Sequence, residues 1–320
     1  MSDETYMQRC LQLAALGLGQ TNPNPMVGAV IVHQDTIIGE GYHHRCGEAH
    51  AEINAINSVK NMELLKESTL YVNLEPCSHF GKTPPCADAI IRYGIPKVVI
   101  GSIDYHDKVN GNGVRKLREA GVEVVENVCL EACEELNKRF FTFHRLHRPY
   151  IILKWAQTRD GYMDIDRGES NVTSYWITNY TLKVLTHKWR GEEDAILVGY
   201  RTMRNDQPQL TTREYPGKDP QRFVMQRGND IISPLPYTPL SENVEEAVEA
   251  LYQSNIQSVI IEGGKKTLEK FLEADLWDEA RILVGNQTWG KGLLAPEIPA
   301  TPERIVNVDD NQLMYVRRQL

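Results

Sequence analysis

The chain has 320 residues, with 35 lysines and arginines against 43 aspartates and glutamates, so its formal net charge is −8. This acidity argues against a nonspecific nucleic-acid binder, which usually presents a basic surface. No run approaches the ~20 apolar residues of a membrane span, and the first residues lack the basic and apolar regions of a signal peptide. We therefore expect a cytoplasmic protein of two ordinary-sized domains, with its six cysteines as thiols and with neither nucleic-acid nor membrane partners.

The first half of the chain predicts a hairpin followed by alternating helices and strands. Helical periodicity over residues 5–18 is followed by a turn-rich loop at 22–25 and by a hairpin of two strands, at 27–32 and 36–42. The later elements are expected to be helices that begin at His50, Cys86 and Val114 and strands at 69–74, 98–100 and 122–125. This order predicts a sheet with helices on both faces.

His50, Cys77 and Cys86 form the most informative pattern of this half. They would supply three zinc ligands and leave the fourth tetrahedral position to water. Glu52 lies two residues after the histidine, where a carboxylate can carry protons without binding the metal. Cys86 is expected in the first turn of a helix, where the helix dipole favours a thiolate. The pattern predicts one zinc per chain and a site for hydrolytic deamination.

The loop between the two cysteines departs from the generic deaminase signature, in which two residues separate them. Here the loop spans 78–85, and it carries His79 and Lys82. These side chains lie next to the expected metal, where they can bind an anionic substrate such as a phosphate ester.

Two other kinds of zinc protein are alternatives. A structural zinc site normally has four protein ligands, and the natural fourth candidate, Glu52, is placed as an acid/base. A deaminase that edits bases in nucleic acids would use the same zinc site. The net charge of −8 and the presence of a whole second domain argue against that alternative.

The segment 146–149 is the expected boundary, which gives domains at 1–146 and 147–320. The second domain predicts strands at 150–154, 195–199, 222–225, 258–262 and 280–284, with helices at 179–190, 242–253 and 267–275 among them. Strands alternating with helices again predict an α/β domain.

Several segments closely resemble the bifunctional deaminase/reductases of riboflavin biosynthesis. In the first half they are Thr21–Gly28, Gly47–Glu52 and Leu74–Asp88, and the long gap between the cysteines is characteristic of that family. In the second half they are Leu153–Ala156, Asp160-Gly161, Trp176–Thr178, Asp206–Thr211 and Glu262–Gly264. The resemblance covers nearly the whole chain and is more specific in the first half.

This resemblance implies a cytidine-deaminase-like α/β/α domain followed by a dihydrofolate-reductase-like α/β domain. The first would deaminate 2,5-diamino-6-ribosylamino-4(3H)-pyrimidinone 5′-phosphate, and the second would reduce the ribosyl group to ribityl with NADPH. The partner would thus be a phosphorylated pyrimidine, and a homo-oligomer is expected. A deaminase with a degenerate reductase domain is the alternative.

The resemblance also implies site residues. Contacts to the deaminase substrate are implied for Asn24, His43, His79 and Lys82. Contacts to the reductase substrate are implied for Ser174, Arg190, Leu210, Arg213 and Glu262. Cofactor contacts are implied for Gln157, Trp176, Thr202, Asp206, Gly264, Lys265, Lys266 and Thr267. The last four follow a strand, so a phosphate could meet backbone N–H groups and two lysines at a helix start.

One stretch of the second half departs from the family pattern. Relatives usually have a strand ending in Ile-Leu-Asp where this chain has Val224-Met225-Gln226-Arg227, and the stretch 228–243 is shorter than expected. An element near the adenosine end of the nucleotide would then be missing, with Arg227 as a substitute that holds a 2′-phosphate. The alternative is that the reductase is slow, altered in its choice of cofactor, or inactive.

Overall fold

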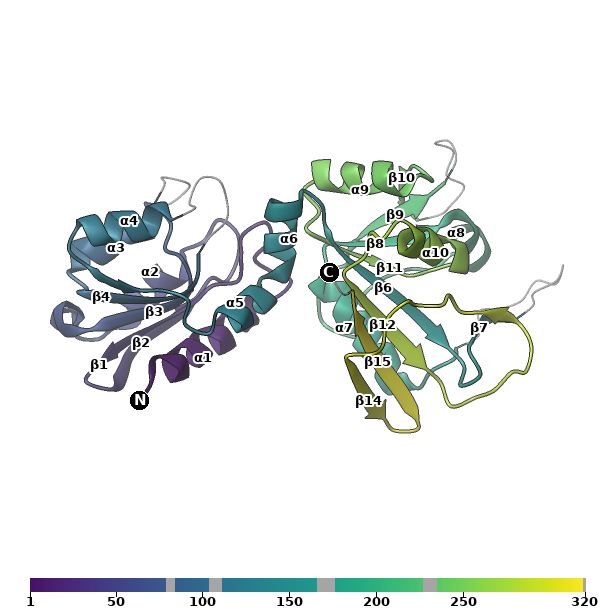
Figure 1. The fold of residues 1–320 in the computed structure, drawn as a ribbon, viewed down its shortest axis with the longest axis horizontal. Coiled ribbons are helices and arrows are strands. Elements are labelled where there is room, and N and C mark those ends of the chain that lie inside the picture. The colour runs from purple at the N-terminus through teal and green to yellow at the C-terminus, as the bar shows by residue number, and fades with distance from the viewer. Residues whose placement is uncertain (79–83, 104–110, 166–175, 227–234, 319–320) are drawn as a thin grey trace. The chain divides into compact units, whose positions relative to one another are not determined.

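The computed structural model (Figure 1) describes residues 1–78, 84–103, 111–165, 176–226 and 235–318. The chain divides into two compact units, Met1–His147 and Arg148–Leu320, and each is described by itself. None of the helices within the described ranges is both long enough and apolar enough to cross a membrane.

The first unit is built on a five-stranded sheet with the strand order β2-β1-β3-β4-β5. The predicted hairpin is confirmed, because β1 (Gly28–His33) pairs antiparallel with β2 (Thr36–Tyr42). β1 also pairs antiparallel with β3 (Thr69–Leu74), and β4 (Lys97–Ser102) and β5 (Glu123–Val125) extend the sheet in parallel. The helical elements are α1 (Asp3–Ala14), η1 (Ala15–Gly17), α2 (Ala51–Ser58), η2 (Met62–Glu67), α3 (Cys86–Tyr93), α4 (Asn112–Glu119), α5 (Leu130–Leu136) and α6 (Lys138–Leu146).

Alternation along the strands gives the first unit two buried faces, as the sequence predicts. Ile31 belongs to the core that α2, α3 and α4 cover, in which Ile90 is fully buried. The neighbouring Val30 belongs to the opposite core, which α1 and α5 cover with Cys10 and Cys133. The unit is therefore a three-layer α/β/α sandwich, and α2 and α3 lie on the same face of its sheet.

Helix α3 begins and ends where the sequence predicts. Pro85 occupies the N-cap position, and its ring fixes a backbone angle suited to a helix start. Gly94 ends the helix in the left-handed conformation, with φ of 71°, which costs glycine little. Cys86 is thereby fixed as the first residue of the helix.

The second unit contains an eight-stranded sheet with the order β10-β9-β8-β11-β6-β12-β15-β14. Its first strand in the chain, β6 (Tyr150–Gln157), lies in the interior of the sheet and pairs in parallel with β11 (Ser258–Ile261) and β12 (Glu279–Val284). The other strands of this sheet are β8 (Ala195–Gly199), β9 (Gln221–Met225), β10 (Thr238–Leu240), β14 (Arg304–Val308) and β15 (Asn311–Arg317). A separate two-stranded sheet joins β7 (Tyr162–Asp164) to β13 (Leu293–Leu294).

Helices cover both faces of the larger sheet. Leu251 of α9 (Val244–Gln253) and Phe271 of α10 (Lys265–Glu273) belong to one core, and Leu182 of α7 (Tyr180–Glu192) belongs to the other. A further helix, α8 (Tyr200–Asp206), follows β8 directly. The five predicted strands and three predicted helices are all present, which confirms the second α/β unit.

The antiparallel end of the large sheet was not predicted. β15 pairs antiparallel with β12 and with β14, and these two C-terminal strands extend the parallel sheet. Most side chains of β14 are exposed, although its sequence, Arg-Ile-Val-Asn-Val, is rich in β-branched residues. The apolar pair Ile305-Val306 was the available signal, and the sequence analysis missed it.

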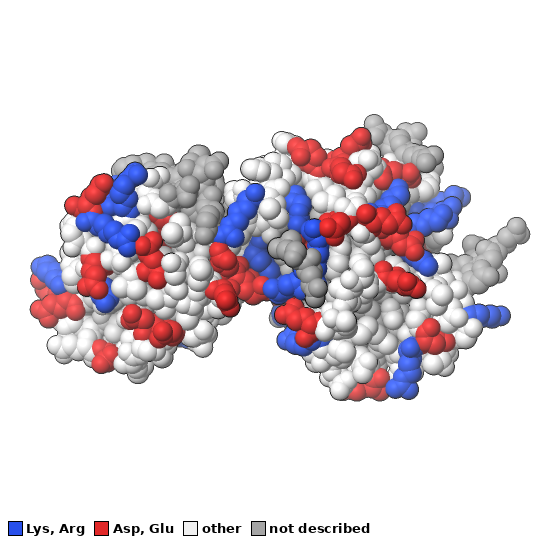
Figure 2. All heavy atoms as spheres, viewed as in Figure 1, with Lys and Arg blue, Asp and Glu red and all other residues white. Residues whose placement is uncertain are grey.

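The charged side chains of both units are mixed in sign. Figure 2 shows Lys and Arg interspersed with Asp and Glu over the described residues of this face. The described part of this face therefore shows no continuous basic surface of the kind that binds nucleic acid.

Candidate active sites

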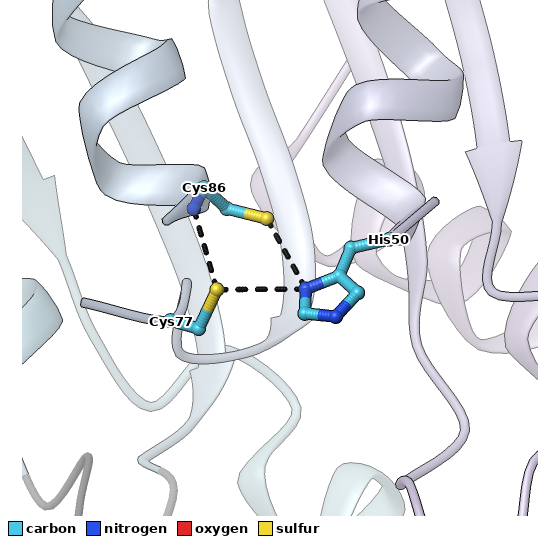
Figure 3. A group of neighbouring side chains, drawn as sticks. All are labelled: His50, Cys77 and Cys86. Carbon is cyan, nitrogen blue, oxygen red and sulfur yellow. Dashed lines mark hydrogen bonds between the residues drawn. The ribbon is translucent and has the colours of Figure 1, made fainter. Parts of the chain in front are cut away.

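Three potential metal ligands converge in the first unit (Figure 3). The ring Nδ1 of His50 lies 3.5 Å from Sγ of Cys77 and 3.3 Å from Sγ of Cys86. All three ligand atoms lie within 4.8 Å of one another, a spacing that allows each to reach a single ion. His50 is the N-cap of α2, Cys86 opens α3, and Cys77 follows β3. The predicted zinc ligands are thus brought together by two helix starts and a strand end.

Of the three ligands, Cys77 is already in its metal-binding form. Hydrogen bonds from the Cys86 thiol and from the ring of His50 lower the pKa of Cys77 to about 4. The backbone N–H of Cys86 also donates to Cys77 Sγ at 3.3 Å. Cys77 is therefore a thiolate at neutral pH, the form in which cysteine binds zinc. Hydrogen bonds to Cys77 raise the pKa of Cys86 and raise that of His50 to about 9, so these two lose a proton when a metal binds.

Glu52 lies in the first turn of α2 and is buried. Burial raises the pKa of its carboxyl group to about 7. A carboxyl group that titrates near neutrality can both accept and donate a proton at the pH of the cell. The side chain thus has the property that the predicted acid/base role requires.

His43 lies beside the metal ligand His50, and Asn24 hydrogen-bonds to His43. The His43 ring is 5.4 Å from that of His50, and its Nδ1 donates to the Ala49 carbonyl at 3.1 Å. Its Nε2 is then the acceptor for the Asn24 amide, at 3.0 Å. Burial lowers the pKa of His43, so the ring is neutral. His79 and Lys82, which were expected here too, lie outside the described residues.

Glu75 supports the Cys77 loop, and the sequence analysis missed it. Its carboxylate accepts hydrogen bonds from the backbone N–H groups of Gly111, Gly113 and Val114, at 3.0, 2.8 and 3.1 Å. A side chain at Gly113 would collide with the Pro76 carbonyl, so the start of α4 lies directly against this loop. The position of Glu75 immediately before Pro76-Cys77 was the available signal.

In the second unit, Glu262 accepts from Arg190 through two parallel hydrogen bonds, from Nε at 3.0 Å and from Nη2 at 2.7 Å. Lys154 Nζ lies 3.8 Å from the same carboxylate. Burial alone would raise the pKa of Glu262, but Arg190 and Lys154 lower it to about 2. Burial also lowers the pKa of Lys154. Lys154 lies within a motif of the sequence analysis, which assigned it no role.

Thr211 accepts hydrogen bonds from two of the residues expected to bind the reductase substrate, Arg190 and Arg213. Its carbonyl accepts from Arg190 Nη1 at 3.2 Å, and its hydroxyl accepts from Arg213 Nη1 at 3.1 Å. Leu210 is buried in a left-handed conformation, and Arg213 is exposed. The structure therefore brings Arg190, Leu210, Arg213 and Glu262 together. Ser174 lies outside the described residues.

The glycine turn after β11 meets α8. Gly263 and Gly264 both have positive φ, and the Gly264 N–H donates to the Thr202 hydroxyl at 3.0 Å. A side chain at Gly199 would collide with the hydroxyl of Thr267. Lys265 and Lys266 form the first turn of α10, which begins two residues earlier than predicted. Thr202, Gly264 and Thr267 thus lie together.

The remaining cofactor candidates lie on other elements. Gln157 ends β6 and accepts from Trp155 Nε1 at 2.7 Å, Asp206 ends α8, and Trp176 is 55% exposed below the Lys183 ammonium. No hydrogen bond among the described residues joins Gln157 or Trp176 to the glycine turn. Arg227 lies outside those residues.

Comparison with known proteins identifies both halves. Residues 1–102 match the cytidine and deoxycytidylate deaminase zinc-binding region, and residues 149–302 match the RibD C-terminal domain. The chain is 35% identical to the riboflavin biosynthesis protein RibD of Aquifex aeolicus over 99% of this chain and 98% of the relative. It is 36% identical to that of Bacillus amyloliquefaciens, over 92% of this chain and 87% of the relative.

Solved structures of related proteins resemble this chain over nearly its whole length. The chain resembles a diaminohydroxyphosphoribosylaminopyrimidine deaminase/5-amino-6-(5-phosphoribosylamino)uracil reductase from Thermotoga maritima with a TM-score of 0.87 and 36% identity, over 98% of each chain. It resembles RibD of Acinetobacter baumannii with a TM-score of 0.90 and 29% identity, over 99% of each chain.

The fold and the His/Cys/Cys group define an enzyme that joins a zinc deaminase to a reductase in one chain. The chain belongs to the RibD family of riboflavin biosynthesis. The predicted family, the order of the two domains and the pairing of the two activities are confirmed. The reductase domain implies a nicotinamide cofactor.

Proposed function

We propose that the chain deaminates 2,5-diamino-6-ribosylamino-4(3H)-pyrimidinone 5′-phosphate and then reduces the ribosyl group of the product to ribityl, with catalytic domains at 1–146 and 147–320. The convergence of His50, Cys77 and Cys86 beside the buried Glu52 carries the first step. The substrate identity is supported by the names of the Thermotoga maritima enzyme and of the other relatives.

In the deaminase, His50, Cys77 and Cys86 would hold zinc, which when bound lowers the pKa of a coordinated water. Glu52 would pass one proton of the attacking water to the ring nitrogen and the other to the leaving amino group, so water and the N=C–NH₂ unit become HN–C=O and ammonia. Asn24 and the neutral His43 bind the pyrimidine edge. His79 and Lys82 bind the substrate phosphate.

In the reductase, C1′ of the sugar gains a hydride from NADPH and the ring oxygen gains a proton as the C1′–O bond breaks. Lys154 is the candidate proton donor, because burial lowers its pKa and it lies 3.8 Å from Glu262. Three of the five N–H groups of Arg190 contact Glu262 and Thr211, which leaves two for a substrate phosphate beside the exposed Arg213. We propose that Leu210 and Ser174 also contact the substrate.

NADPH would bind at the turn formed by Gly264, Lys265, Lys266 and Thr267, where two lysines open α10. Thr202 supports this turn through its hydrogen bond to Gly264, and Gln157, Trp176 and Asp206 would contact other parts of the cofactor. We also propose a cytoplasmic homo-oligomer.

Product analysis tests both steps. Purified zinc-loaded protein is incubated with the diaminopyrimidine phosphate, with and without NADPH. We expect ammonia and the deaminated ribosyl compound without NADPH, and the ribityl compound with it. A deaminated product that is never reduced, together with no NADPH binding by calorimetry, would support the deaminase-only alternative. Absence of ammonia in both reactions would refute the proposed substrate.

A further inference from the structure

Met26 is held by two buried amide side chains that come from distant parts of the first unit. Its backbone N–H donates to Asn137 Oδ1 at 2.8 Å, and its carbonyl accepts from Asn137 Nδ2 at 2.9 Å. Asn73 donates to the same carbonyl at 3.1 Å and accepts from the Gly28 N–H at 2.8 Å. Both asparagines are at most 1% exposed. One residue of the N-terminal loop is thus fixed through both of its backbone polar groups.

Asn137 does not use its side chain locally. It lies between α5 and α6 at the N-cap position of α6, where asparagine ordinarily bonds a backbone N–H of the first turn. Its side chain makes no such capping bond. The amide instead contacts a residue 111 positions earlier in the chain. A capping role therefore does not explain an asparagine at this position.

Met26 lies two residues after Asn24, and only Pro25 separates them. The proline ring fixes one backbone angle, so the position of Met26 restricts that of Asn24. The next residue, Val27, accepts from the His43 N–H at 2.8 Å, and the Asn24 amide contacts the His43 ring at 3.0 Å. The contacts of Asn137 are therefore relayed to Asn24 and to His43, which lies beside the metal ligand His50.

Helix α6 reinforces this arrangement. Phe140 and Phe141 pack against Leu74, which precedes the Cys77 loop, and Val27 packs against the same cluster. Asn137 and α6 lie beyond residue 102, where the match to the deaminase zinc-binding family ends. The packing around the metal site thus extends past the segment that carries the metal ligands.

We propose that Asn137 is a positioning residue of the deaminase, which sets Asn24 and His43 for substrate binding by holding Met26. This inference rests on the proposed deaminase function and extends it to a helix junction outside the zinc-binding region. Asn137 touches neither metal ligand nor substrate, so its removal should weaken substrate binding and leave the zinc in place.

Steady-state deamination by Asn137→Ala tests the proposal, with zinc content and the reductase rate on deaminated substrate measured in the same preparation. We expect KM to rise roughly tenfold, the scale of a lost buried hydrogen bond, with one zinc per chain and an unchanged reductase rate. Asn61→Ala is the matched control, because Asn61 bonds only its own turn, and its KM should not change. Asn137→Asp, of equal size, should also raise KM, since a carboxylate cannot donate to the Met26 carbonyl.

A double-mutant cycle with Asn24→Ala separates positioning from a general structural role. If Asn137 acts through Asn24 and His43, adding Asn137→Ala to the Asn24→Ala protein should raise KM by a clearly smaller factor than it does in the unaltered protein, because only the effect through His43 remains. Three results would overturn the proposal. They are a KM in the double mutant equal to the product of the two single effects, an unchanged KM in both Asn137 variants, or a rise in KM that is accompanied by loss of zinc. If the unaltered protein releases no ammonia, the proposed function itself has failed.

Discussion

Two buried glutamates in this chain have opposite acidities, and their surroundings explain why. Burial raises the pKa of Glu52 to about 7, because few charges compensate the loss of water. Glu262 is also desolvated, but Arg190 and Lys154 lower its pKa to about 2. The first carboxyl group can therefore exchange protons near neutral pH, whereas the second is a fixed negative charge that orients two cations.

Glu52→Gln should separate metal binding from catalysis. The amide is nearly isosteric but cannot take up a proton, so we expect one zinc per chain and a loss of deamination of at least ~10²-fold. Zinc analysis and ammonia release measure the two properties, and exposed Glu48→Gln serves as control. Full activity in the Glu52→Gln protein would contradict the assigned role.

His187 should make the second unit sensitive to moderate acid. It is 1% exposed, its Nδ1 has no hydrogen-bond partner among the described residues, and burial, Arg190 and Arg213 lower its pKa to about 4. The unfolded chain therefore binds a proton below pH ~6.5 that the folded chain binds only near pH 4. Stability should fall as the pH is lowered through this window, by up to ~3 kcal/mol. The Glu262 ion pair affects stability at lower pH, because its contribution is lost between pH ~4.5 and the pKa of Glu262, which is about 2.

Tryptophan fluorescence can measure this effect selectively, because all five tryptophans lie within Arg148–Leu320. Denaturant titrations at several pH values should show a shallower loss of stability between pH ~6.5 and ~4 for His187→Gln than for the unaltered chain. Exposed His44→Gln should leave the slope unchanged. Identical slopes for His187→Gln and the unaltered chain would show that His187 is not the responsible group.

At the scale of elements, the contact between β2 and α2 positions the metal site. A side chain at Gly41 would meet the Ala51 carbonyl at 2.7 Å and collide with the Ala55 nitrogen. Gly41→Ala should therefore displace α2, which carries His50 and Glu52, and destabilise the first unit by about 1–3 kcal/mol. Zinc affinity, measured by competition with a chelating dye, should fall, whereas the tryptophan transition should not move. Gly191→Ala has room for its methyl group, lies in α7 of the other unit, and should leave zinc affinity unchanged. An unchanged zinc affinity in Gly41→Ala would show that α2 tolerates the shift.

The elements that carry the metal were predictable because their ends are marked in the sequence. Pro85 and Gly94 delimit α3, and the apolar run at 69–74 coincides with β3. The two C-terminal strands were missed although their signal is local. β14 carries Ile305, Val306 and Val308 and pairs with β15 across a two-residue turn, but most of its side chains are exposed.

The residues of the candidate deaminase site divide into those that the sequence predicts and those that it does not. The spacing of His50, Cys77 and Cys86 predicts their chemistry, since few other functions need those residues in that order. Asn137 carries no such signal, because its partner is Met26, 111 residues away, and an asparagine between two helices is ordinary. Contacts between distant residues that are not themselves reactive become visible only in the folded chain.

For the molecule as a whole, two chemistries reside in two compact units, and only one of them uses the His/Cys/Cys group. Removal of zinc with a chelator should therefore abolish deamination and leave reduction of the deaminated substrate unchanged. Added zinc should restore ammonia release. A parallel loss of reductase activity, with an unchanged tryptophan signal, would mean that the two activities depend on each other.

The interior position of β6 has a consequence for how the chain is made. Its partners β11 and β12 begin about 100 and 120 residues after β6 ends. At synthesis rates of ~5–20 residues per second, this apolar strand stays unpaired for roughly 5–20 seconds or more before β11 is made. Meanwhile β8, β9 and β10 can already associate with one another. β11 then joins β8 on one side to β6 on the other, and its end delivers Glu262 to Arg190. During biosynthesis, the joining of β8 to β6 through β11 and the formation of the Arg190–Glu262 contact are therefore coupled.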